Sequence, residues 1–451
     1  MLIATICLVM LELAIAVIAP IGFIYFSLWV QTIPYTWNWD TQLIFDTPVG
    51  PLNVVAMQLF GFCIACVLVI LSHFGSAASQ AKHYKWHLGF IGFCILSLSY
   101  APSAAYGFRM IAKLLGPFLF MIVLSCCITT PEELRKALNA IKGSGVILLI
   151  LALFARAAGI DSDPNAAQTG VGGLGPPGMG PPVFAAHMLP VAMLALASYL
   201  CKPRFSTLLF TIASAAAVLG ALQRTSAAAL YLGFSIILFL GTRGIWRLLL
   251  PIGGLVGLPA MMIFSETFRR RMFYGSNTSQ DLLNDPAAAL SKVNSSGRSD
   301  LWDMMLGRFF APHPVAGSGI GSTQDYLYSR AEAGAGVVHS EYVRLLCEVG
   351  VIGLALFVLA ATSYLWGLRR YSANSSTALQ RTSALAAIGS LVAYLVYCST
   401  DNAFDYVSYF GIYAFGLIAI AARARQDDLI SDPALAIVRQ PQLPPYPNLM
   451  R

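Results

Sequence analysis

The sequence predicts an all-α polytopic membrane protein, and three observations support this fold class. The 451-residue chain is 57% hydrophobic, only 11% of its residues are charged, and its mean hydropathy is +0.70. Soluble domains carry roughly a quarter charged residues, so water is a poor solvent for this composition. Apolar runs of about 20 residues, the length that crosses the hydrocarbon core, recur along the chain. Together these features exclude a soluble enzyme and a nucleic-acid-binding protein.

The apolar runs predict about 12 transmembrane helices, separated by polar and turn residues. The first run has no basic n-region and is too long for a signal peptide, so we expect it to be retained. The third run is short and breaks at 101–103, where it could belong to a re-entrant segment, which leaves about 11 or 13 crossings open. Thr130-Pro131-Glu132-Glu133 has capping-box spacing with Pro at the first helical position and predicts that a helix begins there. The predicted spans are 2–29, 52–73, 88–103, 107–129, 143–160, 183–201, 205–222, 225–241, 247–264, 341–366, 382–399 and 405–422.

One long polar segment, 265–340, separates the ninth predicted helix from the tenth and is predicted to be an external loop domain. Nine predicted helices precede it in 1–264, three follow in 341–422, and a Pro-rich cytoplasmic tail occupies 423–451. The loop 161–182 is rich in Gly and Pro, a composition that cannot pack a core. It is predicted to be either a flexible connector or a lid over an active site.

The distribution of basic residues predicts the orientation in the membrane. Of the 28 Lys and Arg residues, 16 gather on alternate connections, which the positive-inside rule places in the cytoplasm. The others, among them Lys113 and Arg344, fall outside or near the outer helix ends. Both termini are therefore expected in the cytoplasm and the long loop in the periplasm. The net charge of +7 reflects topology and contact with anionic lipid.

Cofactor and metal motifs are absent or weak in the sequence. There is no GxGxxG after a strand, no GxxxxGK[ST] and no HExxH. The external acidic spacings, Asp161 with Asp163 and Asp300 with Asp303, are weak for a divalent cation. All nine cysteines lie in or beside apolar runs and are expected to be small buried side chains. We therefore predict no cofactor and no metal.

Two arginines are candidates for anion binding. Arg224 lies between two apolar runs with scarcely any loop, where a permanent charge needs an anionic partner. The alternative is a snorkelling anchor at a helix end. Arg298 follows Ser-Ser-Gly at a predicted helix start, and a helix N-terminus with a guanidinium is a phosphate site. Its alternative is a surface ion pair with Asp300 or Asp303.

Three histidines lie near predicted membrane surfaces. His339 stands at the junction of the long loop and the tenth helix, beside Glu341, where it could serve as a base near neutral pH or as a hydrogen-bonded interfacial residue. His187 is an ionisable group near the start of the sixth helix. His313 lies between two prolines, which is typical of a turn. Glu12 in the first helix is likewise an ionisable group within a predicted span, and its alternative is a pairing with a neighbouring helix.

Four segments resemble the pattern of a known family. They are Gly297-Arg298 with Trp302, His313-Pro314-Val315-Ala316-Gly317-Ser318-Gly319-Ile320-Gly321, His339-Ser340-Glu341-Tyr342 and Glu348-Val349-Gly350-Val351-Ile352-Gly353. Over about 297–354 this resembles the "GR…W…hPl.G.G.G…H..yl…E.G..G" pattern of the O-antigen ligase superfamily, and Gln223-Arg224-Thr225-Ser226 resembles its "SRT" segment. That superfamily includes O-antigen ligases, O-antigen and exopolysaccharide polymerases, and protein O-oligosaccharyltransferases.

The resemblance implies a metal-independent, inverting glycosyl transfer at the periplasmic face of a bacterial inner membrane, with an undecaprenyl-pyrophosphate glycan as donor. It implies that Arg224 and Arg298 hold the pyrophosphate and that His339 activates the acceptor hydroxyl. Physical chemistry agrees, because a pyrophosphate leaving group needs fixed positive charge and guanidinium supplies it without a metal. The further candidates for substrate binding are Gln223, His187, His313 and Glu341.

The sequence departs from the family pattern at two positions and leaves the acceptor open. Ser340 stands where relatives commonly have Asn, and Gln223 where they have Ser; neither change removes a charged group. The acceptor could be a lipid A core sugar, another glycan repeat or a protein hydroxyl. A loop that meets phosphorylated lipid A should carry excess positive charge, whereas the seven acidic and seven basic residues of 265–340 balance, which slightly favours a polymerase.

The partners predicted are the lipid-linked donor, the glycan or lipid A core acceptor, membrane lipid, and chain-length or export proteins, but no nucleic acid. A transporter of lipid-linked glycan is the competing class. It should place charges at several mid-span positions and often contains internal repeats. The predicted charges concentrate at one face and no repeat is visible, which favours the enzyme.

Overall fold

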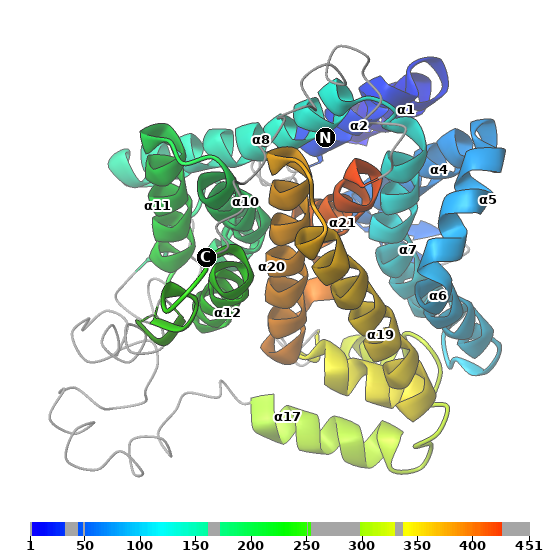
Figure 1. The fold of residues 1–451 in the computed structure, drawn as a ribbon. Helices are drawn as coiled ribbons and strands as arrows, with labels where there is room; N and C mark the ends of the chain where they lie inside the picture. The colour runs from blue at the N-terminus through cyan, green and yellow to red at the C-terminus, as the bar shows by residue number, and fades with distance from the viewer. Residues whose placement is uncertain are drawn as a thin grey trace, which may run out of the picture.

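A computed structural model describes most of the chain as a helical bundle (Figure 1). The described residues are 2–31, 44–47, 50–160, 172–249, 251–253, 298–329 and 337–425. One antiparallel hairpin, β1 (Ile44–Thr47) with β2 (Gly50–Asn53), precedes the helix α4. The sequence analysis did not predict this hairpin, but the all-helical body confirms the predicted fold class.

Within the part of the chain that the structure describes, eight helical segments are long and apolar enough to cross a membrane. They are α4 (Val54–Ser72), α7 (Ala104–Cys127), α8 (Pro131–Ala157), α10 (Pro181–Cys201), α12 (Arg224–Gly241), α19 (Glu341–Ala373), α20 (Ala378–Thr400), and the π-helical turn η5 (Val407–Gly411) continued by α21 (Ile412–Ala424). The protein is therefore a multi-pass membrane protein, although the predicted number of about 12 spans is not confirmed. Most of the predicted span 247–264 lies outside the described residues.

The first predicted span is wrong in form, whereas the third is short and breaks at 101–103, as the sequence indicated. The run 2–29 forms two helices, α1 (Leu2–Ile18) and α2 (Pro20–Val30), because Pro20 disfavours helical geometry at Ala19, whose φ is −145°. The run 88–103 forms only the 13-residue α6 (Lys85–Ser97) and the short turn η2 (Leu98–Tyr100). At 1.5 Å per residue α6 is too short to cross the hydrocarbon core by itself.

Two features predicted from local sequence are confirmed. A helix begins after Thr130, whose hydroxyl accepts a hydrogen bond from the backbone N–H of Glu133 while that carboxylate caps the N–H of Thr130. This helix, α8, then runs unbroken through the predicted span 143–160 as far as Ala157. All nine cysteines are free; six are buried, whereas Cys63 and Cys201 are partly buried and Cys7 is exposed. Glu12 is buried and accepts a hydrogen bond from Gln31.

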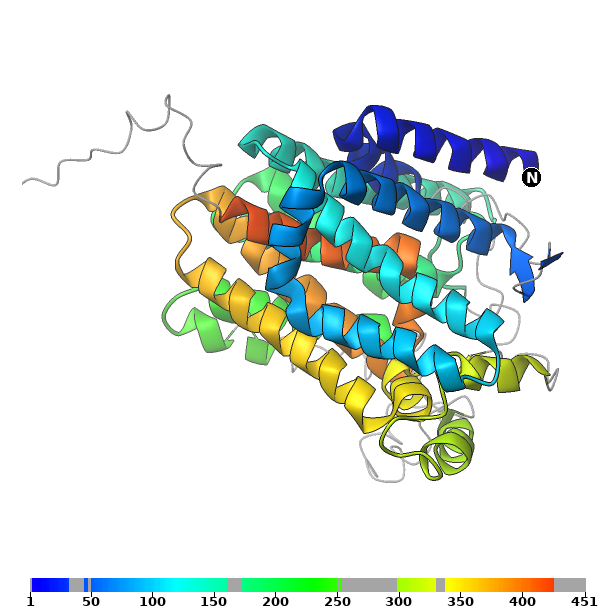
Figure 2. The same cartoon turned by 90° about the vertical axis from the view of Figure 1, so that its right-hand side faces the viewer.

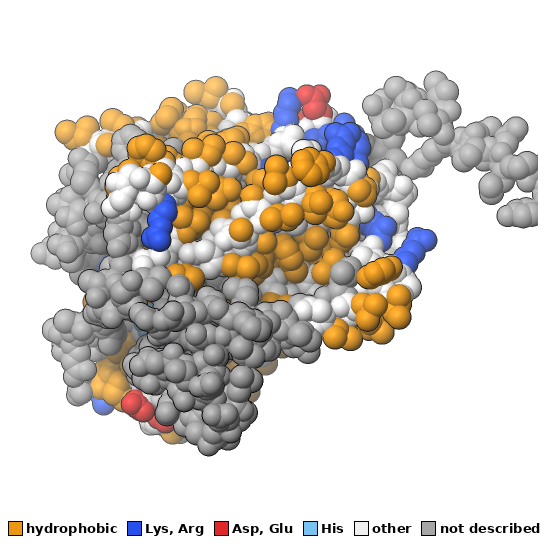
Figure 3. Space-filling model, turned by 90° about the vertical axis from the view of Figure 1, so that its left-hand side faces the viewer, with side chains coloured by type: hydrophobic (Ala, Val, Ile, Leu, Met, Phe, Trp, Pro, Cys, Tyr) orange, Lys and Arg blue, Asp and Glu red, His pale blue; other side chains and the backbone are white. Residues whose placement is uncertain are grey.

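The helices α7, α10, α20 and α21 form the most buried part of the bundle (Figure 1). Small residues let α12 and α20 approach closely, since a Cβ added at Gly389 would lie 2.4 Å from Ile237. The outer surface is apolar; Ile18 and Phe205 are each more than four-fifths exposed. Figure 3 shows such side chains over one broad face. Lipid covers such a surface at no cost, whereas water does not.

Three short elements precede α19 and pack at one end of the bundle (Figure 2). They are α17 (Arg298–Met305), the π-helical turn η3 (Leu306–Phe310) and α18 (Ser322–Ser329). They enclose a small apolar cluster of Met305, Leu327, Val338 and Cys347. The remainder of the predicted loop domain, most of the Gly/Pro-rich loop and the tail lie outside the described residues.

Candidate active site

The helix α19 is opened at Gly350, and the segment 314–319 fills the opening. Gly350 has φ +62° and ψ −166°, so the helical hydrogen-bond ladder is interrupted there. The groups that this kink exposes are all paired with the loop. The four bonds are Ser318 N–H to Cys347 C=O (2.9 Å), Gly319 N–H to Glu348 C=O (2.9 Å), Val351 N–H to Pro314 C=O (2.9 Å) and Ile352 N–H to Val315 C=O (3.2 Å).

This insertion explains the spaced glycines of the motif. Gly317 has φ +74°, and a Cβ there would lie 2.4 Å from the backbone carbon of Glu348. A Cβ at Gly350 would lie 2.4 Å from the carbonyl oxygen of Val315. Only glycine combines a positive φ with such close backbone approach. These glycines therefore fix where the loop sits.

Buried polar side chains tie α18 and α17 to this region. The Glu348 side chain, 1% exposed, accepts a 2.5 Å hydrogen bond from the hydroxyl of Thr323 in α18. Trp302 of α17 donates its indole N–H to the carbonyl of Val338 at 2.8 Å. The tryptophan of the motif therefore anchors the residue just before His339.

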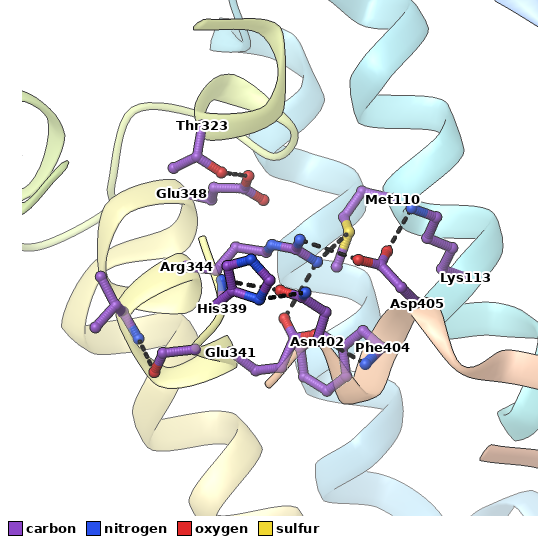
Figure 4. A network of polar contacts seen from close by, with 12 residues as sticks. Met110, Lys113, Thr323, His339, Glu341, Arg344, Glu348, Asn402, Phe404 and Asp405 are labelled. Atoms are coloured by element: carbon purple, nitrogen blue, oxygen red, sulfur yellow. Dashed lines mark hydrogen bonds and ion pairs between the residues drawn. The ribbon is translucent and has the colours of Figure 1, made fainter. Parts of the chain in front are cut away.

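The turn after α20 carries a charged network that joins three helices (Figure 4). Asp405 accepts from Lys113 of α7 at 2.5 Å and contacts Arg344 of α19 at 3.4 Å. Arg344 also pairs with Glu341 at 3.2 Å, and Glu341 accepts from the backbone N–H of Phe404 at 2.8 Å. The two cations hold the pKa of Asp405 down at about 2 against the effect of burial. Asp405 is thus a fixed anion.

His339 lies at the edge of this network and is held by Asn402. Its backbone N–H donates to Oδ1 of Asn402 at 2.9 Å, and its Nδ1 lies 3.2 Å from Nδ2 of the same amide. Because Oδ1 is already engaged by the backbone, the amide N–H₂ faces Nδ1 and donates to it. The neutral ring then carries its proton on Nε2.

Two further properties of His339 follow from its surroundings. Its φ is +57°, a left-handed conformation that is uncommon for a residue with a side chain. Burial lowers its pKa to about 4, with help from the guanidinium groups of Arg298 and Arg344. The imidazole is therefore neutral near pH 7, and its backbone is held in place by the contacts around it.

Arg298 and the start of α12 meet at the end of α20. Arg298 donates a hydrogen bond to the carbonyl of Thr400, and the Thr400 hydroxyl is 2.6 Å from that of Thr225. Arg224, the first residue of α12, is half-buried, and Leu222 before it also has a positive φ, +55°. The structure therefore brings His339, Arg298 and the first turn of α12 around one turn, residues 400–405.

Asp401 is the buried carboxylate nearest to Arg298 in this turn. Its Oδ1 accepts from the backbone N–H of Asn402 at 2.8 Å and from the hydroxyl of Tyr406 at 3.1 Å. Burial raises its pKa, while the charge of Arg298 opposes that rise. Asp401 therefore fixes Asn402, and Asn402 in turn holds His339.

The other predicted site residues do not all join this group. Glu341 does, through Arg344. His187 is fully buried within α10, shares a 3.1 Å hydrogen bond with Ser144 and packs edge-on against Tyr413, which is the setting of a core histidine. His313 is exposed in a turn. Gln223 occupies the N-cap position of α12 without a side-chain capping bond.

Sequence reasoning missed Asn402, Asp401 and Asp405 entirely. It placed Lys113 and Arg344 only among the external basic residues. The available signal was the presence of three polar side chains within 401–405, a short turn between two apolar runs. Ionisable residues so close to membrane spans are often functional. Among the described residues no group of three His, Cys, Asp or Glu could hold a metal ion. Asp161 and Asp163 lie outside the described residues.

The fold and this polar end define a multi-pass membrane protein with a buried cluster of acidic and basic side chains at one end of its helices. Residues 209–358, about a third of the chain, match the family described as O-Antigen ligase. The match includes Arg224, Arg298, His339 and Gly350, whereas Lys113, Asn402 and Asp405 lie outside it. A search of the curated proteins gives no match.

Proposed function

We propose that this protein is a membrane glycosyltransferase that moves a glycan from an undecaprenyl-pyrophosphate donor to an acceptor hydroxyl at the periplasmic face of a bacterial inner membrane. The observation that carries the proposal is the meeting of Arg298, His339 and the first turn of α12 at residues 400–405. All three come from the part of the chain that matches the family. The lipid-facing surface beside them suits a donor with a polyprenyl chain.

The arginines neutralise the leaving group in this proposal. Arg298 uses one Nη1–H for Thr400, so its remaining donors can hold phosphate oxygens in parallel. Arg224 lies at the N-terminus of the 18-residue α12, where backbone N–H groups and the helix dipole also favour an anion. Charge that develops on the pyrophosphate as the bond breaks is thus met by fixed positive groups.

The transfer is a single displacement at the anomeric carbon. The acceptor oxygen forms a bond to that carbon from the face opposite the pyrophosphate, and the carbon–oxygen bond to pyrophosphate breaks with its electron pair. The acceptor proton passes to water. No metal is required, since guanidinium takes the role that a divalent cation plays elsewhere.

The role of His339 depends on its tautomer. The resemblance implies a base, but the contact with Asn402 supports a neutral ring with its proton on Nε2. In that form Nε2 donates a hydrogen bond, and we assign this donor to an oxygen of the departing pyrophosphate. For Nε2 to act as a base, the ring proton would have to lie on Nδ1. The Asn402 amide would then have to flip, and its N–H₂ would face the backbone N–H of His339, donor against donor.

The test is transfer by purified protein in proteoliposomes loaded with undecaprenyl-pyrophosphate glycan. We expect release of undecaprenyl pyrophosphate and a longer or newly attached glycan, both unchanged by EDTA. No consumption of donor in the presence of every acceptor class would contradict the proposal. Loss of activity in EDTA with recovery in Mg²⁺ or Mn²⁺ would contradict its metal-independent form.

Within this class we propose polymerisation over ligation, because the acidic and basic residues of 265–340 balance. Deletion of the gene separates the two. Loss of a polymerase leaves single repeats on the lipid carrier, whereas loss of a ligase leaves finished polymer that is not delivered.

A further inference from the structure

A polar cavity lies at the end of the bundle opposite the candidate active site. We propose that it binds the phosphate headgroup of an anionic phospholipid. The cavity has a volume of about 340 Å³ and opens between the short helix η1 (Lys82–Tyr84), the C-terminal part of α19 and the end of α21. Figure 2 shows these segments at the end of the bundle away from α17.

The lining of the cavity is rich in hydrogen-bond donors. The polar side chains involved are Gln80, His83, Tyr84, Ser363, Tyr371 and Arg425. Among the described residues no carboxylate lines it. Arg425 lies over the ring of Tyr371, 4.7 Å from its centroid, and within the described chain it has no acidic partner. A cavity of donors with an unpaired guanidinium selects an anion, and a phosphate group matches it best.

A buried hydroxyl provides an independent indication of a ligand. Tyr364 is 6% exposed and lines the cavity, yet its hydroxyl has no hydrogen-bond partner. Leaving a buried hydroxyl unpaired is unfavourable, because the group loses its hydrogen bonds to water. A phosphate oxygen in the cavity would accept this hydrogen bond.

The cavity continues into a second polar space of about 250 Å³. The two share Tyr371 and Arg425, and the second is lined by Asn374, Ser375, Ser376 and Gln380 at the turn between α19 and α20. Arg425 therefore stands between two polar spaces, which together have room for a phosphate and the hydroxyl groups of a glycerol headgroup.

The position along α19 places the cavity at a membrane surface. Tyr364 follows Glu341 by 23 residues in α19, or about 35 Å at 1.5 Å per residue, which exceeds the hydrocarbon core of about 30 Å. Trp86 and Trp366 are exposed nearby, as is usual at the interface with headgroups. Basic cavities between helices at this level bind anionic lipid heads. A lipid, rather than free phosphate, is therefore the expected occupant.

The experiment measures lipid binding to the delipidated full-length protein in detergent. Phosphatidylglycerol, phosphatidylcholine and inorganic phosphate are added separately, and the thermal midpoint and bound lipid by native mass spectrometry are recorded. We expect phosphatidylglycerol to stabilise the wild type more than either other probe. Arg425→Ala should weaken its apparent affinity about tenfold or more, and Tyr364→Phe, which removes only the hydroxyl, should weaken it several-fold.

The matched control is Arg369→Ala, which removes one exposed basic side chain from the same end of α19 without touching the cavity. It should retain wild-type affinity for phosphatidylglycerol. Equal losses in Arg369→Ala and Arg425→Ala would show general surface attraction and overturn the site. Inorganic phosphate that stabilises as well as the lipid would overturn the assignment to a lipid head. Because no glycan donor is present, these results are independent of the proposed transferase activity.

Discussion

At the residue scale, Asn402 sets the chemistry of His339 because one amide binds both its backbone and its ring. Asn402→Asp keeps the acceptor for the backbone N–H but presents a second acceptor to Nδ1. The ring should then place its proton on Nδ1 and leave Nε2 without one. If Nε2 donates to the leaving group, the rate of transfer falls by about tenfold or more, as measured in initial rates on lipid-linked donor.

The pH dependence of the transfer rate of Asn402→Asp provides a second measurement. The wild-type pKa of His339 is lowered to about 4, so the imidazole stays neutral down to that pH and the rate has no acidic limb from this group near pH 6.5. The added carboxylate raises the pKa of His339 and moves a protonation step towards neutral pH. A variant that is faster than wild type above this new step would identify Nε2 as a base and refute the donor role.

Arg298 provides another test, based on the difference between the planar guanidinium of arginine, which can form two parallel hydrogen bonds, and the compact ammonium of lysine. Arg298→Lys keeps one positive charge but loses paired hydrogen bonds to pyrophosphate. We expect a loss of about 2–4 kcal/mol in transition-state stabilisation, or roughly 10²–10³ in rate, with normal membrane insertion. Arg308→Lys is the control, because Arg308 lies over the ring of Tyr326 at 4.3 Å and should change the rate only slightly. Equal rates for Arg298→Lys and wild type would remove the clamp role.

At the scale of elements, the kink of α19 depends on glycine at position 350. Gly350→Ala places a methyl group 2.4 Å from the carbonyl of Val315 in a left-handed conformation. We expect a loss of at least about 2 kcal/mol in stability, since the conformation alone costs 1–3 kcal/mol in a residue with Cβ. Thermal unfolding in detergent measures it.

The control for this loss is Gly92→Ala in α6, where a Cβ would meet no atom within 4 Å. Alanine in that helical position should stabilise the protein by about 0.5–1 kcal/mol. Similar midpoints for the two variants would show that the inserted loop does not depend on the kink.

At the scale of the whole molecule, Asp405 connects α7, α19 and the turn after α20. Asp405→Asn leaves Lys113 and Arg344 without their shared anion, and we expect about 3–5 kcal/mol of destabilisation. Because the pKa of Asp405 is lowered to about 2, its stabilisation is complete above pH 4 and is lost as the pH falls towards 2. Thermal midpoints across this range measure the effect. The double variant with Lys113→Met should recover part of the loss, and no recovery would show that the pair is not the cause.

Sequence reasoning succeeds where the cause is local. The cap at Thr130 needs only residues three apart, and the candidate residues Arg298 and His339 stand in a recognisable pattern. The helix break before Pro20 also has a local cause, but hydropathy alone does not reveal it because the run is apolar on both sides. The ion pair of Lys113 with Asp405 joins residues 292 positions apart, and no periodicity in either segment indicates that they meet. The same holds for the insertion of 314–319 into α19.

The opened helix also dictates an order of biogenesis. Until the loop docks, the carbonyls of Cys347 and Glu348 and the amides of Val351 and Ile352 have no partners, at a cost of several kcal/mol each in hydrocarbon. The ribosome synthesises segment 314–319 before α19, so this segment is available for pairing when α19 leaves the translocon. A circularly permuted chain that delivers α19 first would expose these groups to lipid and should be retained at the insertion machinery or degraded.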